Sequence, residues 1–171
     1  MRFLVGLLLC LAIVGRSVCA QAAGTGRAAQ YAGLRYPPLP AELHSLFSSA
    51  VSHDDSVRYT IEYVQDGAKQ LLWLARDTLT VANGRSASFE VRTVLTLARL
   101  GSKETLVQNC RAGSPDSPGE LDLVGIITLG RHEVQRPRRA WRVDWQHERI
   151  VEVPTREITC IDEGYYERRG R

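Results

Sequence analysis

The stretch from Ser56 to Arg76 constrains the fold more than any other part of the chain, because it has the pattern of a β-hairpin. Apolar and polar residues alternate from Val57 to Tyr63, and the pair Asp66-Gly67 suits the two loop positions of a type I′ turn. An isolated hairpin is marginal in water, so its apolar face needs further strands or a helix to cover it. The register predicted from that loop places two apolar pairs on this face: Ile61 opposite Leu72 and Tyr59 opposite Leu74.

The rest of the chain carries enough strand patterns to extend this hairpin into a larger sheet. The sequence therefore predicts a mainly β fold, on the border of the α+β class, with an antiparallel sheet of six to seven strands curled into a small barrel or sandwich. Residues 88–99 form one expected strand, with the odd-numbered side chains from Phe89 to Leu97 on one face, and residues 105–111 return beside it as a second hairpin. Residues 120–129 form a further strand, with Gly125 as a bulge or close-approach point. Residues 140–153 form a third hairpin, and residues 157–161 form the last strand.

One segment before the hairpin has a helical pattern instead. Apolar residues recur at spacings of three and four after Pro40, which suits the first turn of a helix. We expect one short amphipathic helix that lies on the sheet and covers its apolar face. Its apolar stripe is Leu39, Leu43, Leu46, Phe47, Ala50 and Val51.

The first twenty residues have the organisation of a secretory signal peptide. A positive start at Arg2 precedes the apolar run Phe3–Val14, and Val18-Cys19-Ala20 offers small or aliphatic residues before a cleavage site. About a dozen apolar residues are too few to cross a membrane, which needs about 20. The predicted organisation is a signal peptide at 1–20, a flexible lead at 21–36, one disulfide-closed β-rich domain at 37–165 and a frayed basic tail at 166–171. We therefore expect an exported protein, periplasmic or extracellular, without a membrane span.

Net charge and cysteine content narrow the possible binding partners and the compartment of the protein. Cleavage would remove Arg2 and Arg16 with no acidic residue, so the formal net charge of +3 would fall by two, which argues against nucleic-acid binding. Two cysteines would remain, Cys110 and Cys160, and an even count in an oxidising compartment predicts a disulfide. A redox pair or half of a metal site is the alternative, but the chain lacks a C-x-x-C spacing.

No established catalytic or nucleotide-binding motif is present, so we expect neither a metal nor a cofactor. Three histidines adjoin acidic residues, at His53-Asp54-Asp55, His132-Glu133 and His147-Glu148. Each group lies at an expected turn, where such residues are common, and we interpret them as solvated loop ends.

An arginine and tryptophan group is the candidate binding patch. Arginine beside tryptophan can bind anionic groups by paired hydrogen bonds and stacking, and both residue types are frequent in binding hot spots. The alternative is that these arginines pair across strands with Asp144, Glu148, Glu152 and Glu157. The patch consists of Arg136, Arg138, Arg139, Trp141, Arg142, Trp145 and Arg149.

The sequence thus favours a non-enzymatic interaction domain of the cell envelope, whose partner would be an anionic envelope component or a protein. Two alternatives stay open: a small secreted hydrolase with dispersed catalytic residues, and a β-barrel carrier of an apolar ligand. An enzyme needs titratable groups that converge in a pocket, and a carrier needs an apolar cavity.

Overall fold

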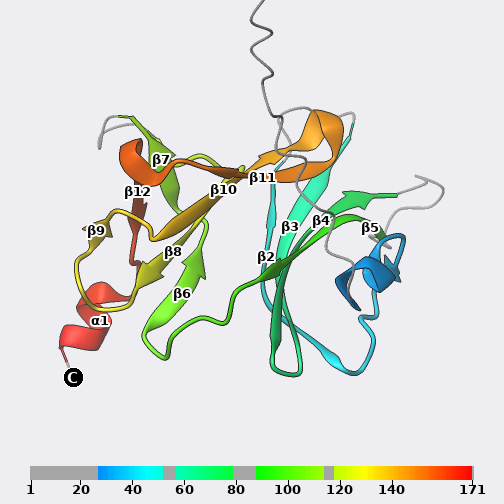
Figure 1. Cartoon of the computed structure of the whole chain (residues 1–171), viewed down its shortest axis with the longest axis horizontal. Coiled ribbons are helices and arrows are strands. Elements are labelled where there is room, and N and C mark those ends of the chain that lie inside the picture. Colours follow the sequence, from blue (N-terminus) through cyan, green and yellow to red (C-terminus); the bar gives the residue numbers. More distant parts are fainter. Residues whose placement is uncertain (1–26, 52–56, 79–87, 114–117, 171) are drawn as a thin grey trace, which may run out of the picture.

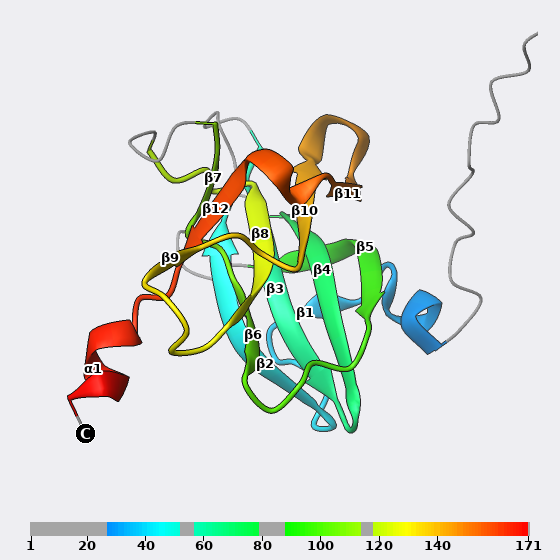
Figure 2. The ribbon, with the colours of Figure 1, turned by 60° about the vertical axis from the view of Figure 1, so that its left-hand side comes forward.

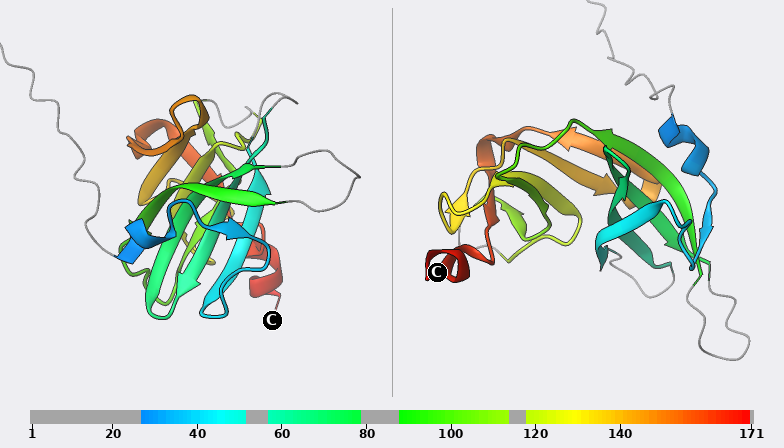
Figure 3. Two further views of the ribbon diagram at one scale, coloured as in Figure 1. Left: turned by 90° about the vertical axis from the view of Figure 1, so that its right-hand side faces the viewer. Right: turned by 90° about the horizontal axis from the view of Figure 1, so that it is seen from below.

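The computed structural model describes residues 27–51, 57–78, 88–113 and 118–170, in which two antiparallel sheets curve around a common interior (Figures 1 and 3). The mainly β class is confirmed, although these ranges hold twelve strands, several of them very short, instead of six to seven. No helix within them is long and apolar enough to span a membrane. The first sheet has the order β1 (Arg35–Tyr36), β5 (Phe89–Leu97), β4 (Lys69–Asp77), β3 (Tyr59–Asp66) and β2 (Leu43–Ala50). The second has the order β11 (Arg149–Val153), β10 (Arg139–Asp144), β8 (Leu123–Thr128) and β6 (Glu104–Val107).

A third, smaller sheet and several short helices complete the fold. The small sheet and α1 lie beyond the second sheet, on the side away from β4 and β5 (Figure 2). The strand order of the small sheet is β7 (Cys110–Ala112), β12 (Ile158–Ile161) and β9 (Val134–Gln135). The helices are η1 (Arg27–Tyr31), η2 (Trp145–His147), η3 (Thr155–Glu157) and α1 (Tyr165–Arg169).

The central hairpin is present as β3 and β4, with its loop one residue later than predicted. Asp66 stays in β3 opposite Lys69, and Gly67, at φ 56°, takes the first loop position, where glycine is typical of a type II′ turn. The carboxylate of Asp66 is buried and accepts a hydrogen bond from the Tyr31 hydroxyl at 3.1 Å, which holds it in the strand. The predicted pairs are therefore wrong by two residues, since Ile61 faces Leu74 and Tyr63 faces Leu72. The predicted apolar face is right, because its side chains all lie in the main core.

The segment predicted as a helix is the strand β2. Its backbone pairs along its length with β3, and a β-bulge interrupts the register between Ser45 and Phe47. The bulge switches faces, so Leu43 packs on the outer face of the sheet and Phe47 on the inner face, while Leu46 is half exposed. The three- and four-residue spacings that resembled a helix are thus those of a bulged strand.

The second predicted hairpin is wrong because β6 leaves the first sheet. The strand β5 forms as expected, but a register shift beside Leu74 places Val91 in the outer cluster and Leu97 in the inner one. Residues 98–103 then carry the chain to the second sheet, where β6 pairs with β8. The predicted third hairpin, β10 with β11, and the last strand, β12, are both confirmed.

The main core fills the space between the two sheets. Ile61 and Leu74 from the first sheet meet Ile126 and Trp141 from the second, all at most 2% exposed. One side of this arrangement is closed where β11 lies against β5. There Glu148 accepts hydrogen bonds on its carboxylate from the Tyr59 hydroxyl at 3.0 Å and from Arg92 at 2.7 Å.

The predicted disulfide is confirmed and joins β7 to β12 within the small sheet. Cys110 and Cys160 lie directly opposite each other and are fully buried. The Gly125 prediction also holds, because a Cβ atom there would lie 2.7 Å from the Cys160 Sγ and 2.8 Å from the Pro137 Cβ. Only glycine lets the disulfide pack this closely against β8.

Residues 27–36 and 165–169 form short elements that the sequence reasoning does not predict. Residues 27–36, part of the expected flexible lead, cross the outer face of the first sheet and bury Tyr31 and Tyr36 against Trp73. The expected frayed tail contributes most of α1, which an ion pair between Arg168 and the buried Asp162 ties to the fold. Both differences arise from tertiary contacts that local sequence patterns do not reveal. The predicted signal peptide lies outside the described residues.

Candidate binding groove at the open seam

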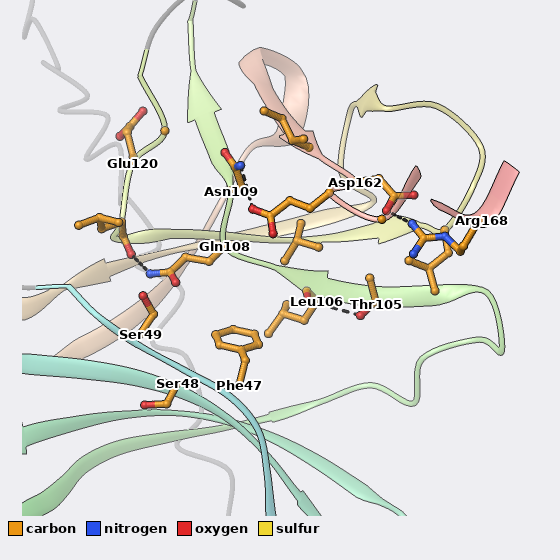
Figure 4. Close-up of a pocket in the computed structure, with 17 residues that line it drawn as sticks. Phe47, Ser48, Ser49, Thr105, Leu106, Gln108, Asn109, Glu120, Asp162 and Arg168 are labelled. Atoms are coloured by element: carbon orange, nitrogen blue, oxygen red, sulfur yellow. Dashed lines mark hydrogen bonds and ion pairs between the residues drawn. The ribbon is translucent and has the colours of Figure 1, made fainter. Parts of the chain in front are cut away.

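The two curved sheets leave one side of the arrangement unpaired. Within the described residues β2 is hydrogen-bonded only to β3, and β6 only to β8, so each is the last strand of its sheet. We call the space between β2 and β6 the open seam. A groove of about 730 Å³ lies there and extends to the start of α1 (Figure 4).

The floor of the groove is apolar. Phe47 of β2 and Leu106 of β6 come from opposite sheets and both pack on the main core. Leu121 also lines the groove, with 54% of its surface exposed. The groove therefore offers apolar contact at its base and at one edge.

The wall opposite β2 is polar and fixed by hydrogen bonds (Figure 4). The Gln108 side chain donates to the carbonyl oxygen of Leu121, and the Asn109 amide donates to the Glu163 carboxylate at 3.0 Å. Asp162, only 3% exposed, pairs with Arg168 and accepts the backbone N–H of Gly130 at 2.8 Å. These contacts hold the wall in shape without a ligand.

Carboxylates outnumber cations in the lining, but two of them are ion-paired, Glu120 with Arg142 and Asp162 with Arg168. Three carboxylates line the groove, on Glu120, Asp162 and Glu163, against the one cation of Arg168. Burial alone would raise the pKa of Glu120, but hydrogen bonds from the Ala112 N–H and from Arg142 lower it below its ordinary value. Glu120 is thus an anion at neutral pH whose charge is balanced by Arg142, and it is not suited to donating a proton.

The residues of the predicted arginine and tryptophan patch do not form one surface. Trp141 is 2% exposed, inside the main core, with the Arg139 guanidinium 4.9 Å from its ring centre. Arg139 and Arg142 leave opposite faces of β10 by strand alternation. Arg142, the half-buried Trp145 and Arg149 line a shallow groove of about 360 Å³, and Arg136 is exposed directly after β9.

Four of the five arginines of that group have carboxylate partners. Two pairs involve partners anticipated from the sequence and two do not. The pairs are Arg149 with Asp144 and Arg139 with Glu152, each at 2.7 Å, together with Arg138 with Glu104 and Arg142 with Glu120, also at 2.7 Å.

The histidine groups are separate from the groove. His132 and His147 are exposed, and His147 contacts Asp144 at 2.9 Å, in keeping with solvated loop ends. His53-Asp54-Asp55 lies outside the described residues. Among the residues that are described, no three His, Cys, Asp or Glu side chains gather in a way that could hold a metal ion.

Comparison with known proteins finds no family model, no curated protein and no solved structure that matches the chain.

The sequence patterns do not reveal the groove residues. They predict Phe47 in a helix, Leu106 in a hairpin with the strand at residues 88–99, and Leu121 at the start of a buried strand. They come from separate segments and share no local motif. The one available signal is Leu121 itself, an apolar residue two positions after a loop rich in proline and glycine.

Proposed function

We propose that this protein is an exported, non-catalytic interaction domain of the cell envelope, and that it holds its partner in the groove at the open seam. The observation that carries the proposal is the groove itself, with an apolar floor, an exposed leucine on its rim and a wall prearranged by hydrogen bonds. Its volume of about 730 Å³ lies within the range typical of binding sites. A buried disulfide supports export, since such bonds persist in oxidising compartments.

The groove favours binding over the two alternative functions. A carrier needs an apolar cavity, whereas the space between the sheets is filled by core side chains such as Trp141 and Leu72. A hydrolase needs a group poised to exchange protons, whereas Asp162 is held in an ion pair and the pKa of Glu120 is lowered.

Site-specific photocrosslinking in the organism that makes the protein tests this proposal. A benzophenone amino acid replaces Leu121 on the groove rim in one variant and Val134 of β9 in a control. These positions are matched because both are apolar and exposed, at 54% and 47%, but only Leu121 lines the groove. We expect one discrete adduct from position 121 that is absent from position 134 and is lost when Phe47→Asp removes the apolar floor.

Other outcomes would contradict the proposal. Equal labelling at both positions would show that the groove is not selective, and no adduct at position 121 would leave it without a partner. A variant with Arg138, Arg139 and Arg142 all changed to Ala provides a further comparison. If the adduct is lost in that variant and Phe47→Asp has no effect, the arginine group is the binding site and the groove is not.

A further inference from the structure

The edge of β2 at the open seam presents backbone groups that have no strand beside them in the described chain. Val51 donates its N–H to the carbonyl of Tyr59, so these two residues form a hydrogen-bonded pair. Hydrogen-bonded pairs alternate along an antiparallel ladder, which directs the N–H and C=O of Ser48 and Ala50 away from β3. Ser48 also lines the groove, so these groups face the seam.

The same reasoning applies to β6 on the other side. Leu129 donates its N–H to the carbonyl of Lys103, in register with the pairing of β6 and β8. By alternation the backbone of Leu106 points away from β8. Its side chain packs in the core while its backbone edge faces the seam, where Thr105 Oγ1 makes only a long contact, 3.5 Å, to its carbonyl. Two strand edges therefore border one groove.

Unpaired strand edges in proteins are usually shielded by charge, proline or a covering segment, because they attract other strands. The part of β2 at the seam, Ser48 to Ala50, has neither a charged residue nor a proline, although a β-bulge precedes it. The groove beside it combines an apolar floor with a lining in which carboxylates outnumber cations. An extended chain would place alternate side chains on that floor and expose the others to the carboxylates.

We infer that the partner is a polypeptide that binds by strand addition: an extended segment, alternately apolar and with at least one Lys or Arg, lies in the open seam and pairs with the edges of β2 and β6. This inference rests on the proposed function. Main-chain hydrogen bonds supply affinity in this mode, and the side-chain contacts select the sequence. Phe47 and Leu106 receive the apolar side chains, and the exposed carboxylate of Glu163 receives the basic one.

The test is selection from a phage library of random linear twelve-residue peptides against the oxidised full chain, followed by affinity measurements on the selected peptides in free form. Ser48→Pro is the informative variant, because proline removes an N–H that the β3 ladder does not use, and Ser48→Ala is its matched control. A second arm uses the wild-type protein with peptides N-methylated at alternate positions, so it does not depend on how the proline variant folds.

We expect enriched peptides with alternating apolar residues and a basic residue. Ser48→Pro and N-methylation should each weaken their binding by about tenfold or more, since each removes main-chain hydrogen bonds, while Ser48→Ala should leave binding unchanged. Raised salt should weaken binding as well, because the basic residue meets carboxylates.

Failure to enrich any peptide, or binding that tolerates both Ser48→Pro and N-methylation, would overturn strand addition. The proposed function is judged separately by the crosslinking at Leu121, so a specific adduct there, combined with no peptide binding, would keep the groove as the site and reject an extended polypeptide as its occupant.

Discussion

Replacing Gly125 by alanine tests the packing of the disulfide against the second sheet. The added Cβ would meet the Cys160 Sγ at 2.7 Å, the Pro137 Cβ at 2.8 Å and the Cys110 Sγ at 3.1 Å, all closer than normal contact. The two sulfurs are bonded to each other and fully buried, so neither can move alone. Overpacking a core typically costs about 1–3 kcal/mol, and the lower chain entropy of unfolded alanine returns about 0.5 kcal/mol, so we expect a net loss of about 1.5 kcal/mol.

Urea unfolding followed by tryptophan fluorescence measures this loss. Gly101→Ala is the control, since its Cβ would come no nearer than 3.4 Å, and only to the flexible side chain of Glu104; its stability should change by less than about 0.5 kcal/mol. In a background with Cys110→Ala and Cys160→Ala the sulfur contacts are gone, so Gly125→Ala should cost only about 1 kcal/mol there. An equal cost in both backgrounds, or no cost in the native one, would refute the close approach as the reason for glycine.

Three further predictions follow from contacts in the fold. Replacing both Cys110 and Cys160 by Ser should lower the free energy of unfolding by ~4 kcal/mol, because the disulfide closes a loop of 50 residues; a urea midpoint equal to that of the native chain would contradict this. Trp73→Phe removes the indole N–H that donates to the buried Glu62 at 2.8 Å, so it should cost about 1–3 kcal/mol, and adding Glu62→Leu should recover part of the loss in the same assay. The pKa of Glu120 is lower in the folded chain than its ordinary value of 4.5, so the stability that Glu120 contributes is complete above pH 4.5 and is lost as the pH falls through the folded pKa. Glu120→Gln should therefore make the melting temperature fall less steeply below about pH 5. A variant whose melting temperature depends on acid pH as the native chain's does would disprove this role.

The sequence predicts those features that depend on short-range patterns. The hairpin of β10 and β11 is predicted from alternating apolar and polar residues, and the disulfide from the even number of cysteines that remain after cleavage of the signal peptide. Both are confirmed. Gly125 could be marked as a close-approach point because an isolated glycine within a strand pattern is typical of a bulge or of a second chain segment packed against the backbone.

Features set by long-range pairing could not be predicted in this way. The spacing of Leu43 and Phe47 fits one face of a helix as well as two faces of a bulged strand, and only pairing with β3 decides between them. Likewise β6 follows β5 along the chain, yet successive strands are neighbours in only about two-thirds of cases. The candidate groove depends on both misassigned elements, so it could not be found before the strand order was known.

The segment that crosses the outer face of the first sheet sets a practical limit on where a recombinant form of this protein can begin. Gly33 donates its N–H to Val91, and the Tyr31 hydroxyl supplies a donor to the buried Asp66. A protein expressed from Pro37 onward would lack Tyr31 and Tyr36, so the indole of Trp73 would be exposed and Asp66 would lose the hydrogen bond from Tyr31. The exposed apolar face of the sheet would then promote aggregation. A start at or before Arg27 keeps the cover, and the cleavage expected after Ala20 would keep it as well.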